Sequence, residues 1–387
     1  MMPLNGKSGR NYTPLYLLAS LGAAGMAVVF YLHLMFLTPH PDTPVPTWDS
    51  LKAFWKIAAA WERIAVASVW SITLLLVLLH GALLIWNARA YRAFKRTTAY
   101  NELTGSNATF QRMAWPLTLA MGMNAGFVAA LLIIPGFWSV IEHVFPWAIA
   151  AFLLLGLSAL GMQASILGAQ LTRGGFQCEK NNNLGMMMSP FALAMIAVGF
   201  SGPAAMSGST PTVLVAAAFC VTFFVMAVLS SLVYLLTAMR AIFALGVNQD
   251  ASQTLMVGVP ITTILGIAAY RLAMMLGHHF GVVIPPIFLF LGFVALMAVQ
   301  WMFILFGAAI LWRNDMLRKA LSDGPTPLSF ALVCPGVGFV VTLQFFIHRG
   351  LTAVAPESTA VVPAMTAAIV LAQIGLLAAY ANMLKRQ

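Results

Sequence analysis

An arginine and two adjacent histidines interrupt an otherwise apolar stretch, YRLAMMLGHHFG, at residues 270–281. Ionisable groups are costly at membrane depth, so Arg271, His278 and His279 are candidate functional residues. Imidazole is a common ligand of iron, and a guanidinium pairs with a carboxylate through two hydrogen bonds. Because Arg271 precedes His278 by seven residues, we expect the two on one helical face, about 10 Å apart along the axis.

The composition assigns the chain to the membrane proteins. Apolar residues make up 61% of it, charged residues only 8%, and the mean hydropathy is +0.90. An ordinary soluble domain carries about 25% charged residues. The net charge of +10 comes from short basic clusters between apolar runs, which indicates membrane anchoring and no nucleic-acid partner. Cys178, Cys220 and Cys334 form no CxxC pair, so we expect no thiolate metal site and no covalent haem.

Ten apolar runs are long enough to cross a hydrocarbon core of about 30 Å. They lie at 14–38, 64–87, 114–136, 146–170, 189–207, 213–238, 255–277, 284–311, 327–347 and 360–382. The sequence therefore predicts an all-α polytopic membrane protein, with residues 1–387 as a single integral domain and an extended outer loop at 39–60.

The basic residues predict the direction of the spans. Alternating loops place fifteen of the twenty on one side and four on the other, with Arg271 in a span. The fifteen are Lys7, Arg10, Arg89, Arg92, Lys95, Arg96, Arg112, Arg173, Lys180, Arg240, Arg313, Arg318, Lys319, Lys385 and Arg386. Lys and Arg concentrate on the cytoplasmic side, so we expect both termini in the cytoplasm, in a bacterial inner membrane.

The odd-numbered spans share a motif at their predicted cytoplasmic ends that the even spans lack at theirs. Each starts with proline, continues apolar and meets glycine within three turns: TPLYLLASLGAAG, WPLTLAMGMNAG, SPFALAMIAVGFSG, VPITTILGIAA and TPLSFALVCPGVG. Proline suits the first helical turn, and glycine permits close approach or a bend. The pattern predicts a helical hairpin repeated five times, with five bent odd helices inside a ring and five even helices outside.

This architecture resembles the family of bacterial tellurite-resistance and dicarboxylate transporters and plant slow anion channels. The resemblance covers the whole chain in architecture and rests on the repeated opening proline. It implies ten helices in five hairpins around a central pore, with a phenylalanine on the ninth helix as the gate. Phe330 is the nearest positional match to that phenylalanine, and Phe339 is next. The histidines and the arginine within the spans depart from what the family implies.

Three odd spans carry histidine at one predicted level near their outer ends. These histidines are His33, His279 and His348. Each follows the opening proline of its span by 19 to 21 residues, which is about 30 Å along a helix. Neighbouring spans of the predicted ring would thus bring imidazoles together. One interpretation is that the outer interface merely tolerates histidine, whose polar edge reaches water there.

The other interpretation is haem ligation. Facing imidazoles in a helical bundle are standard axial ligands of haem iron, and Arg271 would pair with a propionate. We expect one haem b between two of His33, His278/His279 and His348. A second haem could be ligated by His80 with Met121 or Met123 as the thioether partner. The protein would then be a b-type cytochrome, passing electrons between a periplasmic redox protein and membrane quinone, without side-chain catalysis.

The alternative function is that of an anion channel or small-anion exporter. Arg271 and the outer histidines would attract the ion, and Phe330 or Phe339 would gate the pore. All ten acidic residues fall in predicted loops or at span ends, which leaves no carboxylate for acid–base chemistry within the membrane. Lipid, and in this interpretation a small anion, are the expected partners, and the sequence is also compatible with a homo-oligomer.

Overall fold

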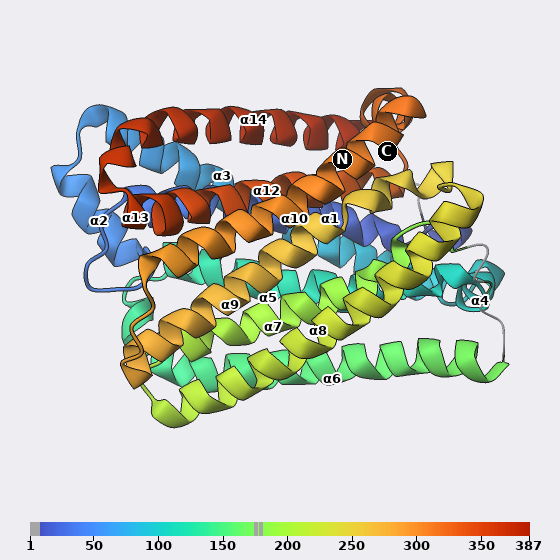
Figure 1. The fold of residues 1–387 in the computed structure, drawn as a ribbon, viewed down its shortest axis with the longest axis horizontal. Coiled ribbons are helices and arrows are strands. Elements are labelled where there is room, and N and C mark those ends of the chain that lie inside the picture. The colour runs from blue at the N-terminus through green and yellow to red at the C-terminus, as the bar shows by residue number, and fades with distance from the viewer. Residues whose placement is uncertain (1–7, 174–176, 178–180) are drawn as a thin grey trace.

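The computed structural model describes residues 8–173, 177 and 181–387, so Lys7, Cys178 and Lys180 lie outside the described residues. The described chain is helical, without strands, and contains ten helices long and apolar enough to cross a membrane (Figure 1). The prediction of a polytopic all-α membrane protein is thereby confirmed.

The spans fall into an inner and an outer set. At least half of the most apolar stretch is buried in each odd span, against 28% or less in each even span. The inner helices are α1 (Leu17–Leu37), α5 (Ala114–Ile133), α7 (Met188–Met206), α9 (Gly258–Phe280) and α12 (Val333–Phe345). The outer helices are α3 (Ala60–Phe94), α6 (Ile141–Arg173), α8 (Thr210–Leu245), α10 (Pro286–Arg313) and α14 (Val362–Arg386).

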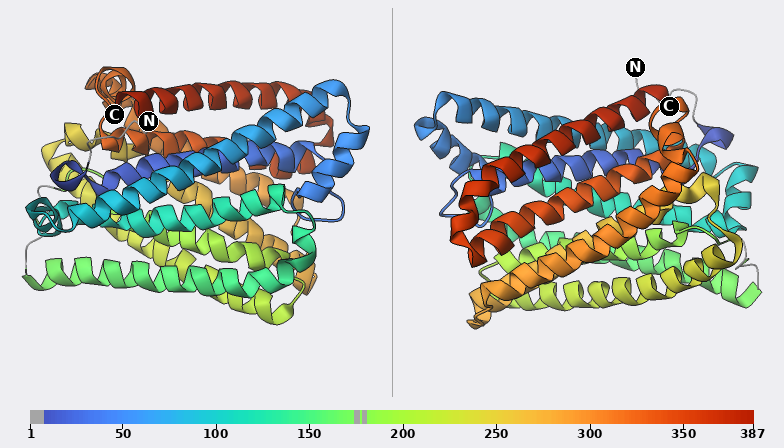
Figure 2. Two further views of the ribbon diagram at one scale, coloured as in Figure 1. Left: turned by 180° about the vertical axis from the view of Figure 1, so that it is seen from behind. Right: turned by 45° about the horizontal axis from the view of Figure 1, so that its top comes forward.

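Consecutive inner and outer helices pack as pairs: α1 with α3, α5 with α6, α7 with α8, α9 with α10, and α12 with α14. Among the inner helices, α1 contacts α5, α5 contacts α7, α7 contacts α9, and α9 contacts α12, which in turn contacts α1. The two views of Figure 2 show outer helices packed on the outside of the set of inner helices. The start of α1 and the end of α14 lie at the same end of the bundle.

Each inner helix is preceded by a short 3₁₀ segment. The segments are η2 (Pro14–Tyr16), η3 (Asn107–Met113), η6 (Gly185–Met187), η7 (Gln249–Met256) and η9 (Pro327–Leu332). Proline is then the third residue of four inner helices, where its missing N–H has no intrahelical partner. These four are Pro116, Pro190, Pro260 and Pro335. In the ninth span, therefore, the counterpart of Pro260 is Pro335, because Pro327 opens the 3₁₀ segment instead.

Glycines allow the inner helices to approach one another closely. A Cβ atom on Gly338 of α12 would lie 3.0 Å from the Pro260 Cα atom and 2.9 Å from Thr263 Oγ1 on α9. A Cβ atom on Gly22 of α1 would lie 3.2 Å from a Val333 methyl group. Small residues are a usual means of bringing membrane helices into contact.

The extended first connection contains α2 (Trp48–Ile57), at the end of the bundle opposite the end of α14. Its first turn is closed by a capping box between Thr47 and Ser50. Asp49 accepts a hydrogen bond of 2.8 Å from the Gly136 backbone N–H, in the connection between α5 and α6. The remaining short helices are α4 (Thr98–Thr104), α11 (Met316–Arg318) and α13 (Thr352–Val354).

We expect Gly338→Ala to lower the thermal midpoint of the purified protein, because the new methyl group would overlap the backbone of α9. Overpacking of this kind typically costs about 1–3 kcal/mol. Gly81→Ala, in α3, is the matched control, since nothing lies within 4 Å of the added Cβ atom there. Scanning fluorimetry in detergent measures both. Equal midpoints for the two variants would contradict the close approach of α9 and α12.

Candidate functional site

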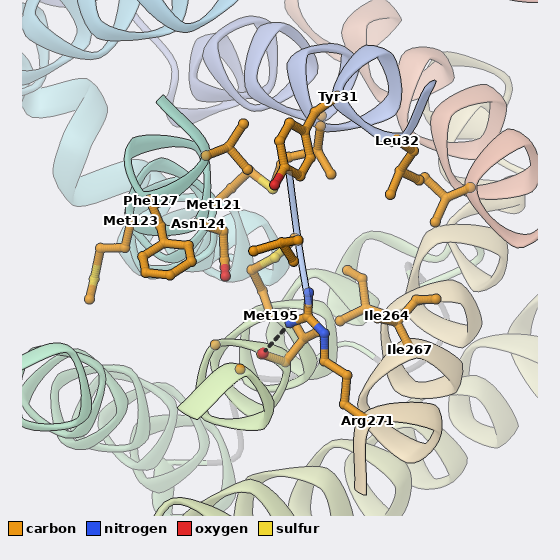
Figure 3. Close-up of a pocket in the computed structure, with 18 of the residues that line it drawn as sticks. Tyr31, Leu32, Met121, Met123, Asn124, Phe127, Met195, Ile264, Ile267 and Arg271 are labelled. Carbon is orange, nitrogen blue, oxygen red and sulfur yellow. Dashed lines mark hydrogen bonds between the residues drawn. The ribbon is translucent and has the colours of Figure 1, made fainter. Parts of the chain in front are cut away.

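A cavity of about 580 Å³ lies among the inner helices. All five inner helices and α6 contribute to its wall. The wall is predominantly apolar, with methionine prominent (Figure 3); its methionines are Met35, Met121, Met123, Met195 and Met206. A concave apolar space with a few polar groups is the usual form of a small-molecule site.

Arg271 is the only charged residue among the described residues that line this cavity. Its Nη1 atom lies 3.5 Å from the Val198 carbonyl oxygen and 3.4 Å from Ser201 Oγ, both on α7. These donor–acceptor distances are at the long end for hydrogen bonds. Within the described chain no carboxylate forms an ion pair with it, so its charge is compensated only by dipoles.

Arg271 lies too far from the end of α9 for its guanidinium to reach the membrane surface. It lies nine residues before the end of α9 at Phe280, about 14 Å along the axis. Its guanidinium instead turns sideways toward α7 and the cavity. A charged side chain near the middle of a membrane helix costs about 2.5–3.5 kcal/mol. The guanidinium is therefore placed where a negative group within the cavity could pair with it.

Polar groups other than Arg271 are few in the cavity. The Tyr31 side chain of α1 points toward Arg271 across the cavity (Figure 3), and its hydroxyl donates to the Pro46 carbonyl at 3.1 Å. Asn124 of α5 also lines the wall and donates its amide N–H to the Ala120 carbonyl at 2.9 Å. Their donors are thus partly used within the protein, which leaves Arg271 as the main group for recognising an anion.

A second cavity, of about 510 Å³, lies where the inner helices begin. Residues of all five preceding 3₁₀ segments line it, among them Leu15, Phe110, Gly185, Thr254 and Leu328. Asparagines contribute the most polar part of its wall, namely Asn107, Asn181, Asn183 and Asn248. On α7, Met188 borders this cavity and Phe191, one turn later, borders the Arg271 cavity.

His33 is buried and bonded to two glutamines. Its Nε2 lies 2.7 Å from Gln373 Oε1 on α14, so that nitrogen is a donor, because a carbonyl oxygen only accepts. The Gln344 amide nitrogen on α12 lies 3.5 Å from Nδ1 and 3.4 Å from Nε2. Both ring nitrogens of His33 therefore face amide groups of the protein.

The other outer histidines lie at different levels. The His348 ring stacks on Phe36 of α1, with centroids 4.5 Å apart, one turn beyond His33. Counted from the third residue of each helix, His33 and His348 follow by 14 and 13 residues, whereas His279 follows by 19. His278 is exposed and His279 is half-buried in the last turn of α9. The structure thus brings His33 and His348 to one level, with His279 farther out.

His80 lies deep between α1, α3 and α5. Its Nδ1 lies 2.9 Å from the Ser20 carbonyl oxygen, which makes Nδ1 the donor and Nε2 the acceptor. Nε2 has no hydrogen-bond partner among the described residues, and a Cβ atom on Gly122 would lie 2.7 Å from it. Nε2 therefore faces the backbone of α5. Met121 and Met123, its proposed partners, line the Arg271 cavity.

The two candidate gate residues lie away from the Arg271 cavity. Phe330 is fully buried in η9 with its ring edge-on to Tyr380 of α14, and Phe339 packs against Trp301 of α10. Neither is among the residues that line the cavity. The phenylalanine of the ninth span that does line it is Phe345, whose ring also packs against Tyr270.

Uncharged polar residues within the spans were not among the predicted site residues. Gln300 of α10 is fully buried and donates to Thr263 Oγ1 at 2.9 Å and Thr342 Oγ1 at 2.8 Å. A glutamine in an apolar run is itself a signal, because a polar group in hydrocarbon requires an internal partner. Gln344 and Gln373 carried the same signal beside His33.

We expect diethylpyrocarbonate, which acylates accessible imidazoles, to modify His278 and to leave His33 and His80 unmodified in the folded protein. Burial and neutral amide or backbone partners protect the latter two. Mass spectrometry of peptides from reagent-treated protein in detergent measures this, with denatured protein as the control. Modification of His33 as fast as His278 would contradict the placement.

Comparisons with protein-family models, with curated proteins and with solved structures found no match for the chain. Among the described residues, no group of three or more His, Cys, Asp or Glu side chains is arranged to hold a metal ion.

Proposed function

We propose that the protein conducts an anion across the membrane and that Arg271 binds this anion in the central cavity. One observation carries the proposal: a guanidinium lines an apolar cavity, with two long hydrogen bonds and no carboxylate partner in the described chain. A buried cation requires compensation, and a mobile anion supplies it where the protein does not. Guanidinium also suits planar oxyanions through paired hydrogen bonds.

The pathway in this proposal runs along the axis of the five inner helices. Their successive contacts, and the contact of α12 with α1, support a closed ring like that of the anion-channel family. The Arg271 cavity and the asparagine-lined cavity would be two chambers of one pathway. Met188 and Phe191 would bound the narrow section between them. The excess of basic residues supports a cytoplasmic location for the asparagine-lined end and for both termini.

We expect Arg271→Gln to reduce anion current about tenfold or more. Two unit charges about 4 Å apart attract by about 4 kcal/mol at an effective dielectric constant of ~20. Loss of a third of that energy already weakens binding about tenfold. Purified protein in planar bilayers, with gradients of chloride or nitrate, gives the current and its reversal potential.

Arg240→Gln is the matched control, because Arg240 is exposed on α8 and the substitution removes the same charge. Its current should equal that of the unmodified protein. Arg271→Lys keeps the charge and should retain part of the current. A reversal potential that follows the cation gradient in the unmodified protein would contradict the proposal, as would full current in Arg271→Gln.

Haem binding stays a separate prediction. The shared level of His33 on α1 and His348, three residues beyond the end of α12, favours it. The amide partners of both His33 nitrogens weigh against it, because a ligating nitrogen must be free of its proton and its partner.

The haem hypothesis makes its own prediction, which an absorption spectrum tests. Protein purified from haem-replete cells should show a Soret band that His33→Ala and His348→Ala each weaken, while Arg271→Gln alters it less. Folded protein without a Soret band would contradict haem binding and leave the anion pathway untouched.

A further inference from the structure

This inference rests on the proposed function, in which Arg271 binds an anion. The chemistry of the cavity wall limits which class of anion that is. Three features decide it: the number of charges in the wall, the volume in relation to a small ion, and the apolar surface that continues from Arg271 to the lipid side. Each feature constrains a different part of the ligand.

The wall compensates one negative charge. Arg271 is its only charged residue in the described chain, and the other polar groups are neutral. A dianion would therefore leave its second charge facing methionine and phenylalanine side chains, and an unpaired charge in such surroundings is strongly unfavourable. The cavity thus favours a ligand with a single anionic group.

The volume exceeds what a small inorganic ion needs. The cavity measures about 580 Å³, whereas one water occupies about 30 Å³ in the liquid. A halide of similar size would leave most of the cavity to be filled by water against apolar walls. A ligand with an apolar body would instead bury that surface, at about 25 cal/mol per Å².

The apolar wall extends from the ring to the lipid-facing side. Phe127 of α5 lies across the cavity from Arg271 (Figure 3), and Met123 lies beside it on the same helix. From α6, Phe145 and Trp147 continue the wall, and Trp147 is 77% exposed. The cavity therefore reaches the outside of the helix bundle at α6. An apolar ligand body can occupy this branch while its anionic head lies at Arg271.

We propose that the ligand of the Arg271 cavity is an organic monocarboxylate with an apolar aromatic or aliphatic body. The carboxylate pairs with the guanidinium, and the body lies along Met123, Phe127 and the α6 wall. Methionine side chains adapt to bodies of different shape, so the site accepts a class of monocarboxylates rather than one compound.

Four probes separate the contributions of charge and body. Benzoate carries one carboxylate and an apolar ring, benzyl alcohol has the ring without charge, acetate has the charge without the ring, and phthalate adds a second carboxylate. Calorimetry on the purified full-length protein in lipid nanodiscs measures binding, with empty nanodiscs subtracted. Benzoate should bind at least about tenfold more tightly than each of the others.

Two variants test separately the roles of the guanidinium and of the aromatic wall, and a third controls for misfolding. Arg271→Gln should remove the preference of benzoate over benzyl alcohol, whereas Phe127→Ala should weaken benzoate severalfold and leave acetate unchanged. The thermal midpoint and the elution profile of each variant establish folding. Arg271→Lys keeps a cation at this position and should retain part of the benzoate affinity. It tests the role of the charge where the glutamine variant is misfolded.

The outcomes distinguish this inference from the proposed function. Anion current that requires Arg271, together with phthalate or acetate binding as tight as benzoate, overturns the monocarboxylate inference and leaves the anion pathway standing. Benzoate binding that requires Arg271, without any anion current, overturns conduction and supports the ligand class. Benzyl alcohol binding equal to that of benzoate in the unmodified protein overturns the role assigned to the carboxylate.

Discussion

The charge of one guanidinium inside the helix bundle, that of Arg271, is the main constraint on what the central cavity can hold. Arg271 lies more than two helical turns from the end of α9, and its nearest polar neighbours on α7 are a carbonyl and a hydroxyl. Dipoles stabilise such a charge only partly, because the low dielectric inside the bundle makes desolvation expensive. The cavity in front of the guanidinium is therefore a place where an external negative charge gains more than it would in water.

Polar side chains of the outer helices hold the walls of this cavity in register. Three outer helices each insert one polar group between inner helices; the pairs are His80 with Ser20, Gln300 with Thr263, and Gln373 with His33. In hydrocarbon these groups have no water as an alternative partner. Each pair thus fixes both the depth and the rotation of its outer helix, while glycines such as Gly338 let the inner helices meet.

Hydropathy and proline placement were sufficient to predict the ten helical spans and a buried odd set, because length and burial are encoded in composition. Depth counted from an opening proline was less reliable. Pro335, not Pro327, stands third in its helix, so the residues of the ninth span lie closer to the opening end of the bundle than predicted. Rotation about the helix axis could not be obtained from an apolar run at all. Phe330 and Phe339 were therefore chosen by position, whereas their rings pack against outer helices.

The contrast between Arg271 and His278 shows why residue type alone did not define the site. Seven residues separate them, so they share a helical face, yet Arg271 lines the cavity and His278 is exposed. Two turns add about 10 Å of depth, and over that distance α9 leaves the packed inner set. A histidine near water incurs little desolvation cost, whereas an arginine within the bundle requires a partner. Depth and residue type together therefore distinguish Arg271 from His278, because only the arginine places a permanent charge inside the bundle.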